Sequence, residues 1–187
     1  MLVQFSVKNY RSIADKVTLS LLAGTDKEHA NDLIQADDKK QLVPTVAIYG
    51  ANASGKSNML MALKTMQDMI TGTSAQLLKE KKLPHDPFAF DPFCKEHHPT
   101  EFEIIYYYRG IKYAYGFSYD SKQILTEMLY HWPNGREALI FSRENDKFEF
   151  RENVNEQTTL AGRTSANRLY LVSSNEWNSP QTELAYK

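Results

Sequence analysis

The chain has 187 residues, of which 42% are hydrophobic and 24% charged, as in one ordinary soluble domain with a substantial core. Its 22 lysines and arginines balance 23 aspartates and glutamates, which excludes a global basic field for nucleic acid or membrane. A single cysteine excludes an intramolecular disulfide, and no signal peptide or bilayer-spanning apolar run is found. These features predict a cytoplasmic protein with no membrane partner.

Two short strands are the first elements predicted along the chain. Residues 3–7 and 17–21 alternate apolar and polar side chains, which is the period of a half-buried strand. The polar connection at residues 9–15 predicts that the two strands pair antiparallel. Residues 24–41 are polar and mixed in charge, and we interpret them as a long surface loop.

A strand, a tight loop and a helix are predicted next. Residues 42–49 are mostly apolar, which favours a strand buried on both faces of a parallel sheet. Residues 57–70 place apolar side chains at helical spacing, with Gly72 as the stop. Between them the chain fits the P-loop pattern G-x-x-x-x-G-K-S with Gly50, Ala51, Asn52, Ala53, Ser54, Gly55, Lys56 and Ser57.

Each part of this motif has a role in holding a triphosphate. The loop presents backbone N–H groups to the phosphates, and the helix N-terminus adds its positive dipole end. Gly55 lets the backbone approach closely, and Lys56 would contact the β- and γ-phosphates. The Ser57 hydroxyl would bind Mg²⁺, and the Asn58 N–H would face the α-phosphate. The predicted cofactors are therefore ATP and Mg²⁺.

The second half of the chain predicts an antiparallel meander. The Asn134–Gly135 pair between two apolar runs is a strong hairpin signal. The predicted strands lie at residues 102–108, 111–119, 124–132, 137–142 and 147–151. Their many tyrosines are interpreted as packing side chains rather than a platform for stacking bases. Residues 169–172 are predicted as a short buried strand, and a helix is expected to begin at Pro180.

A cluster of potential metal ligands lies in a proline-flanked stretch. Cys94, His97 and His98 have side chains that suit zinc, but no second pair of ligands appears elsewhere in the sequence. We interpret this cluster as accidental.

The first seventy residues resemble a known family. Val3 to Ile13 reads V-x-F-x-V-x-N-Y-R-S-I, Leu19 to Ala23 reads L-S-L-L-A, and Ala47 to Asn58 carries the P-loop. These segments resemble the ATP-binding-cassette group that includes SMC, RecF and OLD-type ATPases. Within it, the chain is most similar to bacterial ATPases of restriction and abortive-infection loci, such as the RloA type.

The resemblance implies an α/β P-loop NTPase fold, in which a mixed sheet surrounds the Walker A strand, loop and helix. Residues 1–187 would form the N-terminal lobe of an ATPase head. Within it, residues 1–72 would be the nucleotide-binding core, 100–151 an antiparallel β subdomain, and 165–187 an incomplete return to the core. The resemblance also implies that Arg11 and Ser12 approach the nucleotide. From the residues alone, Arg11 would be a surface cation.

The sequence lacks several motifs that the family needs for hydrolysis. It has no apolar run ending in an acidic pair, no signature like L-S-G-G-Q, no D-loop and no switch histidine. No catalytic residue is therefore assigned, and this chain alone is expected to be inactive. The missing motifs would lie in a C-terminal lobe of a longer ATP hydrolase. The resemblance further implies a head-to-head homodimer, with DNA or a nuclease effector as further partner, in bacterial defence or a DNA transaction.

Two other functions remain open from the sequence. One is a nucleotide-gated interaction module, in which binding matters and hydrolysis hardly occurs. The other is a P-loop kinase, although no arginine lid or acceptor site is evident. Small GTPases are disfavoured because the chain lacks N-K-x-D and D-x-x-G, the motifs they use to read guanine and γ-phosphate.

Overall fold

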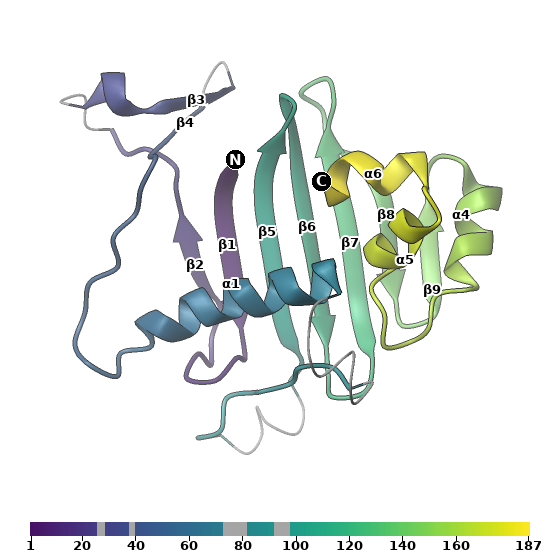
Figure 1. Ribbon diagram of the computed structural model, residues 1–187, viewed down its shortest axis with the longest axis horizontal. Coiled ribbons are helices and arrows are strands. Elements are labelled where there is room, and N and C mark those ends of the chain that lie inside the picture. The colour runs from purple at the N-terminus through teal and green to yellow at the C-terminus, as the bar shows by residue number, and fades with distance from the viewer. Residues whose placement is uncertain (26–28, 38–39, 73–81, 92–97) are drawn as a thin grey trace.

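A single antiparallel sheet organises most of the chain in the computed structural model, which describes residues 1–25, 29–37, 40–72, 82–91 and 98–187 (Figure 1). Its seven strands run in the order β2-β1-β5-β6-β7-β8-β9. They are β1 (Leu2–Lys8), β2 (Val17–Ser20), β5 (Thr100–Tyr108), β6 (Ile111–Tyr119), β7 (Ile124–Trp132), β8 (Ala138–Glu144) and β9 (Lys147–Phe150). The predicted N-terminal pair and the predicted meander are both confirmed.

Strand β1 joins the N-terminal strand pair to the meander. On one side Phe5 lies opposite Leu19 of β2, and on the other it lies opposite Ile104 of β5. Strands from residues 1–20 and from residues 100–150 therefore share one continuous sheet. The predicted mixed sheet is wrong for the described residues, because every strand pair among them is antiparallel.

Helix α1 (Lys56–Thr71) crosses one face of the sheet, over β1, β5 and β6 (Figure 1). It buries Met59, Ala62, Met66 and Met69 in the main apolar core. The helix ends at Gly72, which adopts a left-handed conformation with φ 69° as predicted. Burial of this apolar stripe holds the helix on the sheet, because flexible methionine side chains fill irregular gaps between the layers.

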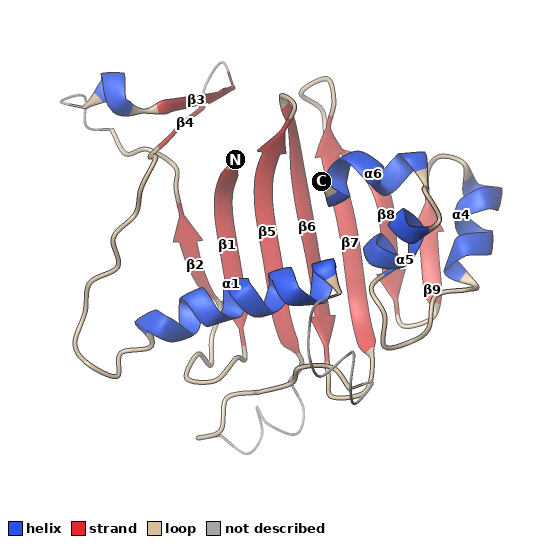
Figure 2. Cartoon of the chain, in the orientation of Figure 1, coloured by secondary structure: helices blue, strands red, loops and turns tan. Residues whose placement is uncertain are grey.

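Three shorter helices cover the other end of the same face, over β7, β8 and β9 (Figure 2). They are α4 (Val154–Ala161), α5 (Tyr170–Glu176) and α6 (Pro180–Tyr186). The helix starting at Pro180 is confirmed, and α4 was not predicted. The predicted strand at residues 169–172 is wrong, since α5 begins at Tyr170 and Leu169 is its N-cap. Their burial was correctly anticipated, but a short apolar run cannot distinguish a strand from a buried helix.

The tyrosines of the meander serve mainly as core residues. Tyr113, Tyr115 and Tyr119 on β6 are each at most 2% exposed. Phe102 on β5 packs with Phe117 in an edge-to-face pair, with ring centroids 5.7 Å apart. The prediction that these aromatic side chains pack rather than stack bases fits their burial.

The chain between β2 and α1 departs most from the sequence prediction. Inside the predicted loop lie a short 3-10 helix (η1, Ala30–Asp32) and the hairpin of β3 (Ile34–Asp37) and β4 (Lys40–Leu42). The predicted buried strand at residues 42–49 is wrong, because residues 43–50 form no strand. Val46 and Ile48 are 39% and 37% exposed, and Tyr49 is 90% exposed. The described part of the chain supplies no parallel strand to pair with this apolar segment.

Candidate nucleotide-binding site

The P-loop residues form a compact turn that leads directly into α1. Ala53 and Gly55 both adopt positive φ, at 63° and 89°. A left-handed conformation is costly for alanine, so this turn is held by its surroundings. A Cβ added at Gly55 would lie 3.1 Å from the Ser12 Oγ, and one at Gly50 would lie 3.0 Å from the Ser54 Oγ. The two glycines therefore keep the loop free of side chains where space is tightest.

The loop and the first turn of α1 supply unpaired backbone donors. The Asn58 N–H donates to the Gly55 carbonyl at 2.9 Å. In the part of the chain that the structure describes, the N–H groups of Gly55, Lys56 and Ser57 donate no hydrogen bond. Such amides at a helix N-terminus attract an anion, because they combine open donors with the positive end of the helix dipole. This donor set fits a phosphate group.

The Lys56 ammonium lies over the loop rather than away from it. It donates to the carbonyls of Gly50 at 2.8 Å and Ala51 at 2.6 Å, and it lies 3.3 Å from the Ser54 Oγ. Neutral carbonyl oxygens hold a cation less strongly than phosphate oxygens do. A phosphate entering the loop would therefore compete well for this lysine.

The connection between β1 and β2 lies against the P-loop. The Ser12 Oγ accepts a hydrogen bond from the Asn58 Nδ2 at 2.6 Å, which joins two segments far apart in the sequence. Arg11 lies beside α1, where it contacts Asp86 and Met61 rather than the P-loop. Its Nε lies 2.9 Å from a carboxylate oxygen of Asp86, and its Nη1 lies 2.8 Å from the Met61 sulfur. The structure thus brings Ser12 to the loop and places Arg11 in an ion pair beside it.

A cavity of about 490 Å³ opens between these two segments. This volume is typical of small-molecule sites. Its lining combines the P-loop residues Ser54, Gly55 and Lys56 with residues of the β1–β2 region and with Ile48, Tyr49 and Met59. Asp15 also lines the cavity, although no sequence motif pointed to this carboxylate. Its position three residues after Ser12 was the available signal, but only the folded loop brings this carboxylate to the site.

Metal ligands at this site are few. Ser57 is exposed at the start of α1, and no group of three His, Cys, Asp or Glu side chains among the described residues could hold a metal. Mg²⁺ commonly binds through nucleotide phosphates and one or two protein ligands, so the site fits an ion that arrives with ATP. Cys94 and His97 lie outside the described residues. The His98 carbonyl accepts a hydrogen bond from the Asn9 Nδ2 at 2.6 Å.

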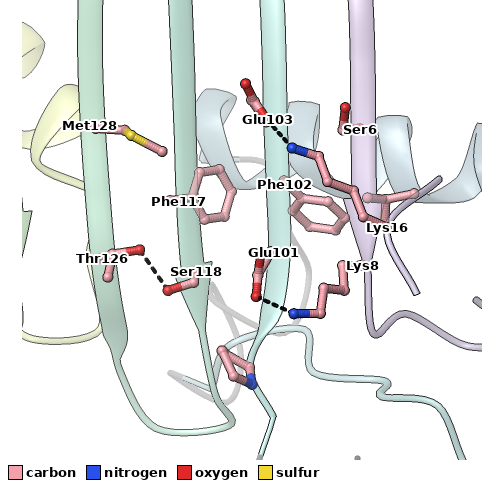
Figure 3. A pocket seen from close by; sticks show the side chains of 12 residues that line it. Ser6, Lys8, Lys16, Glu101, Phe102, Glu103, Phe117, Ser118, Thr126 and Met128 are labelled. Carbon is pink, nitrogen blue, oxygen red and sulfur yellow. Dashed lines mark hydrogen bonds and ion pairs between the residues drawn. The ribbon is translucent and has the colours of Figure 1, made fainter. Parts of the chain in front are cut away.

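A second hollow, of about 410 Å³, lies on the sheet face away from α1 (Figure 3). Its charged side chains pair with each other: Lys8 with Glu101 at 3.1 Å, and Lys16 with Glu103 at 2.6 Å. Because these charges are already satisfied, they offer less to a ligand than the open amides of the P-loop. The cavity beside Lys56 is therefore the candidate functional site.

The fold and this site define a P-loop protein of the α/β class with an antiparallel sheet. Residues 46–186 match the family described as "AAA domain, putative AbiEii toxin, Type IV TA system", and the chain belongs to this family. The match begins before the P-loop and ends within α6. No curated protein matches the chain. The family supports a nucleotide-binding, ATPase-like function in a toxin or abortive-infection context.

None of the helices in the described residues is long and apolar enough to cross a membrane.

Proposed function

We propose that the chain binds Mg-ATP through residues 50–58 as part of the head of a bacterial defence or DNA-transaction ATPase. The observation that carries this proposal is the convergence of unpaired amides at Gly55, Lys56 and Ser57 with the Lys56 ammonium beside one cavity. Phosphates would replace the carbonyl oxygens that now hold Lys56. Ser57 would contribute its hydroxyl to Mg²⁺, and the ion would neutralise phosphate charge when bound.

The nucleoside would occupy the remainder of the cavity. Val17, Leu19 and Ile48 give it an apolar wall, and Tyr49 adds an aromatic ring. A flat base is accommodated well by such a surface, whereas the polar end of the cavity at Ser54 and Lys56 suits the phosphates. Arg11 would reach the nucleotide only by exchanging the Asp86 carboxylate for a phosphate, with which a guanidinium can also pair.

Hydrolysis would require a second lobe. Phosphoryl transfer needs a group that positions the attacking water, and Asp15 is the only carboxylate among the described residues that line the cavity. Apolar side chains are also exposed around the loop: Tyr49 at 90%, Leu60 at 58% and Met61 at 42%. Exposed apolar groups in one region are typical of a surface that another protein segment covers. A C-terminal lobe that covers this surface would complete the site.

The wider roles of the protein rest on its resemblance to cassette ATPases. In that arrangement two heads bind two ATP molecules between them, so that ATP controls a head-to-head homodimer. DNA or a nuclease effector would respond to this dimerisation. A nucleotide-gated interaction module with little hydrolysis is the second candidate, favoured by the scarcity of carboxylates in the cavity lining.

Calorimetry with Lys56→Ala tests the binding step. Lys64→Ala is a matched control, because Lys64 lies on the same helix and pairs with Asp68 instead of the loop. We expect Mg-ATP to bind the wild type and the Lys64 variant alike, and to bind the Lys56 variant at least tenfold more weakly. Equal affinity of all three proteins for Mg-ATP would refute the proposed site.

Turnover separates the two candidate functions. We expect negligible ATP hydrolysis by residues 1–187 alone. If a longer protein containing an acidic pair after an apolar strand hydrolyses ATP, the ATPase head is supported. If such a protein binds ATP without turnover, the interaction module is supported instead. Strong hydrolysis by residues 1–187 that depends on Lys56 would show that a catalytic group within this chain has been overlooked.

A further inference from the structure

A third cavity, of about 240 Å³, lies between the sheet and α6, and we call it the α6 cavity. Its walls come from β6, β7, β8 and α6, together with residues near the start of α4. Figure 1 shows that α6 and the first turn of α1 lie toward opposite ends of the sheet. The α6 cavity is therefore separate from the candidate ATP site, and any ligand it holds would be additional to ATP.

Four polar side chains that line the α6 cavity have hydrogen-bonding groups left unused. They are Tyr113, His131, Glu152 and Gln181. Tyr113 is only 2% exposed, yet its hydroxyl forms no hydrogen bond with any described residue. This hydroxyl is not one of the described buried polar atoms that lack a partner, so it reaches the open space of the cavity, where water or a ligand can bond it. A hydroxyl that is open to the cavity and has no partner among the described residues is the observation that points to a ligand.

Three further side chains that line the α6 cavity also have hydrogen-bonding groups without a partner among the described residues. The imidazole of His131 and the carboxylate of Glu152 make no hydrogen bond or ion pair within the described structure. Burial lowers the pKa of His131, with the Glu152 charge opposing this, so the ring is neutral at pH 7. A neutral imidazole offers one donor and one acceptor. The Gln181 side chain accepts from the Ser179 hydroxyl at 3.0 Å and keeps its amide hydrogens free.

The shape and charge of the α6 cavity restrict the ligand. Ile111, Ile140 and Leu184 supply apolar surface, and the Tyr113 ring lies 6.2 Å from the His131 ring. These surfaces suit a flat ring. Among the described residues, no lysine or arginine lines the cavity, whereas one carboxylate does. A phosphorylated ligand would lack a counter-charge here, while an amino group on the ring could donate to Glu152.

From this geometry we propose that the α6 cavity binds an uncharged, amino-substituted heteroaromatic ring such as the base of a purine nucleoside. At about 240 Å³ the cavity is smaller than the roughly 300–1,000 Å³ of drug-sized sites. The Glu152 carboxylate accepts from the amino group, and Tyr113 and His131 bond the ring nitrogens. A ligand here also fills the gap under α6, which is anchored by the hydrogen bond from the Tyr106 hydroxyl to the Ala185 carbonyl.

Nuclear magnetic resonance titration of the isotope-labelled chain with adenosine tests this proposal. We expect shifts in the amide signals of residues 111–113, 131, 152 and 181–184. Inosine carries a carbonyl where adenosine has its amino group, and it should bind at least tenfold more weakly. Because Mg-ATP binding is tested with Lys56→Ala, and adenosine binding by signal shifts at residues that do not line the cavity beside Lys56, failure of the ATP site and failure of this site can be told apart.

The matched variants are Glu152→Gln and Glu144→Gln, both at exposed positions, of which only Glu152 lines the α6 cavity. We expect the Glu152 variant to bind adenosine at least tenfold more weakly, equivalent to about 1.4 kcal/mol, and the Glu144 variant to match the wild type. Three results would overturn the proposal: no adenosine binding, shifts confined to residues 12–19 and 48–58, or an unaffected Glu152 variant.

Discussion

Removing the Glu127 side chain should destabilise the protein strongly, because this carboxylate joins the sheet to α5. Glu127 on β7 is fully buried and accepts hydrogen bonds from the Tyr115 hydroxyl at 2.9 Å and from the amides of Tyr170 at 2.6 Å and Leu171 at 2.9 Å. The Arg143 guanidinium, which is 4% exposed, lies 3.8 Å away. Burial raises the pKa of Glu127, and these four groups oppose the rise.

The magnitude follows from what Glu127→Ala would leave behind. Two backbone amides at the start of α5 would lose their acceptor, at about 1–3 kcal/mol for each buried unsatisfied group. Arg143 would keep its hydrogen bonds to the carbonyls of Asn145 and Arg168, which limits the electrostatic penalty. We expect a total loss of roughly 3–5 kcal/mol, as is typical when one partner of a buried ion pair is removed. Glu127→Gln keeps the volume and should cost less.

Urea unfolding followed by circular dichroism measures these free energies. Glu144→Ala is the control, since Glu144 is an exposed carboxylate on the adjacent strand, and its loss should change stability by less than about 0.5 kcal/mol. A cost below about 1 kcal/mol for Glu127→Ala would refute the reasoning. It would mean that water or another group satisfies the two amides of α5 equally well.

Two further predictions concern the P-loop and the half-buried His85. Gly55→Ala should reduce Mg-ATP affinity at least tenfold, because the new Cβ would lie 3.1 Å from the Ser12 Oγ. Gly72 also has a positive φ, but a Cβ added there meets no atom within 4 Å. Gly72→Ala is therefore the control, and calorimetry should find its Mg-ATP affinity unchanged. His85 carries an Nε2 atom with no hydrogen-bond partner among the described residues, and burial lowers its pKa below 6.5 despite two nearby aspartates. The unfolded state therefore binds the proton more tightly, so this histidine should cost stability as pH falls below about 6.5. His85→Phe should lessen that loss in unfolding experiments, and a measured His85 pKa above 6.5 would contradict the sign.

Local sequence patterns determined the strands of the meander and the helix after the P-loop. Alternation along residues 111–119 and the Asn134–Gly135 turn act between neighbours in the chain, so they specify a hairpin without outside help. The left-handed stop at Gly72 is equally local. The P-loop motif can also be recognised from its own residues, although the positive φ of Ala53 shows that the surroundings help to hold the turn.

Elements whose conformation depends on distant partners were predicted less well. Residues 170–172 begin a helix whose first amides, those of Tyr170 and Leu171, are accepted by Glu127, more than forty positions earlier. Asp15 and Arg11 illustrate the same limit at the site. The fold turns Asp15 toward the cavity and pairs Arg11 with Asp86, and neither outcome is encoded in the spacing of nearby residues.

The sequence by itself determined that a P-loop motif is followed by an amphipathic helix, and that antiparallel hairpins make up residues 100–150. Only the tertiary structure decided that β1 lies between β2 and β5, which joins the N-terminal pair to the meander in one sheet. It also decided that residues 43–50 lack a strand partner and leave Tyr49 exposed. The physical reason is that strand pairing is a contact between distant segments, whereas turns and helix ends are satisfied by the residues beside them.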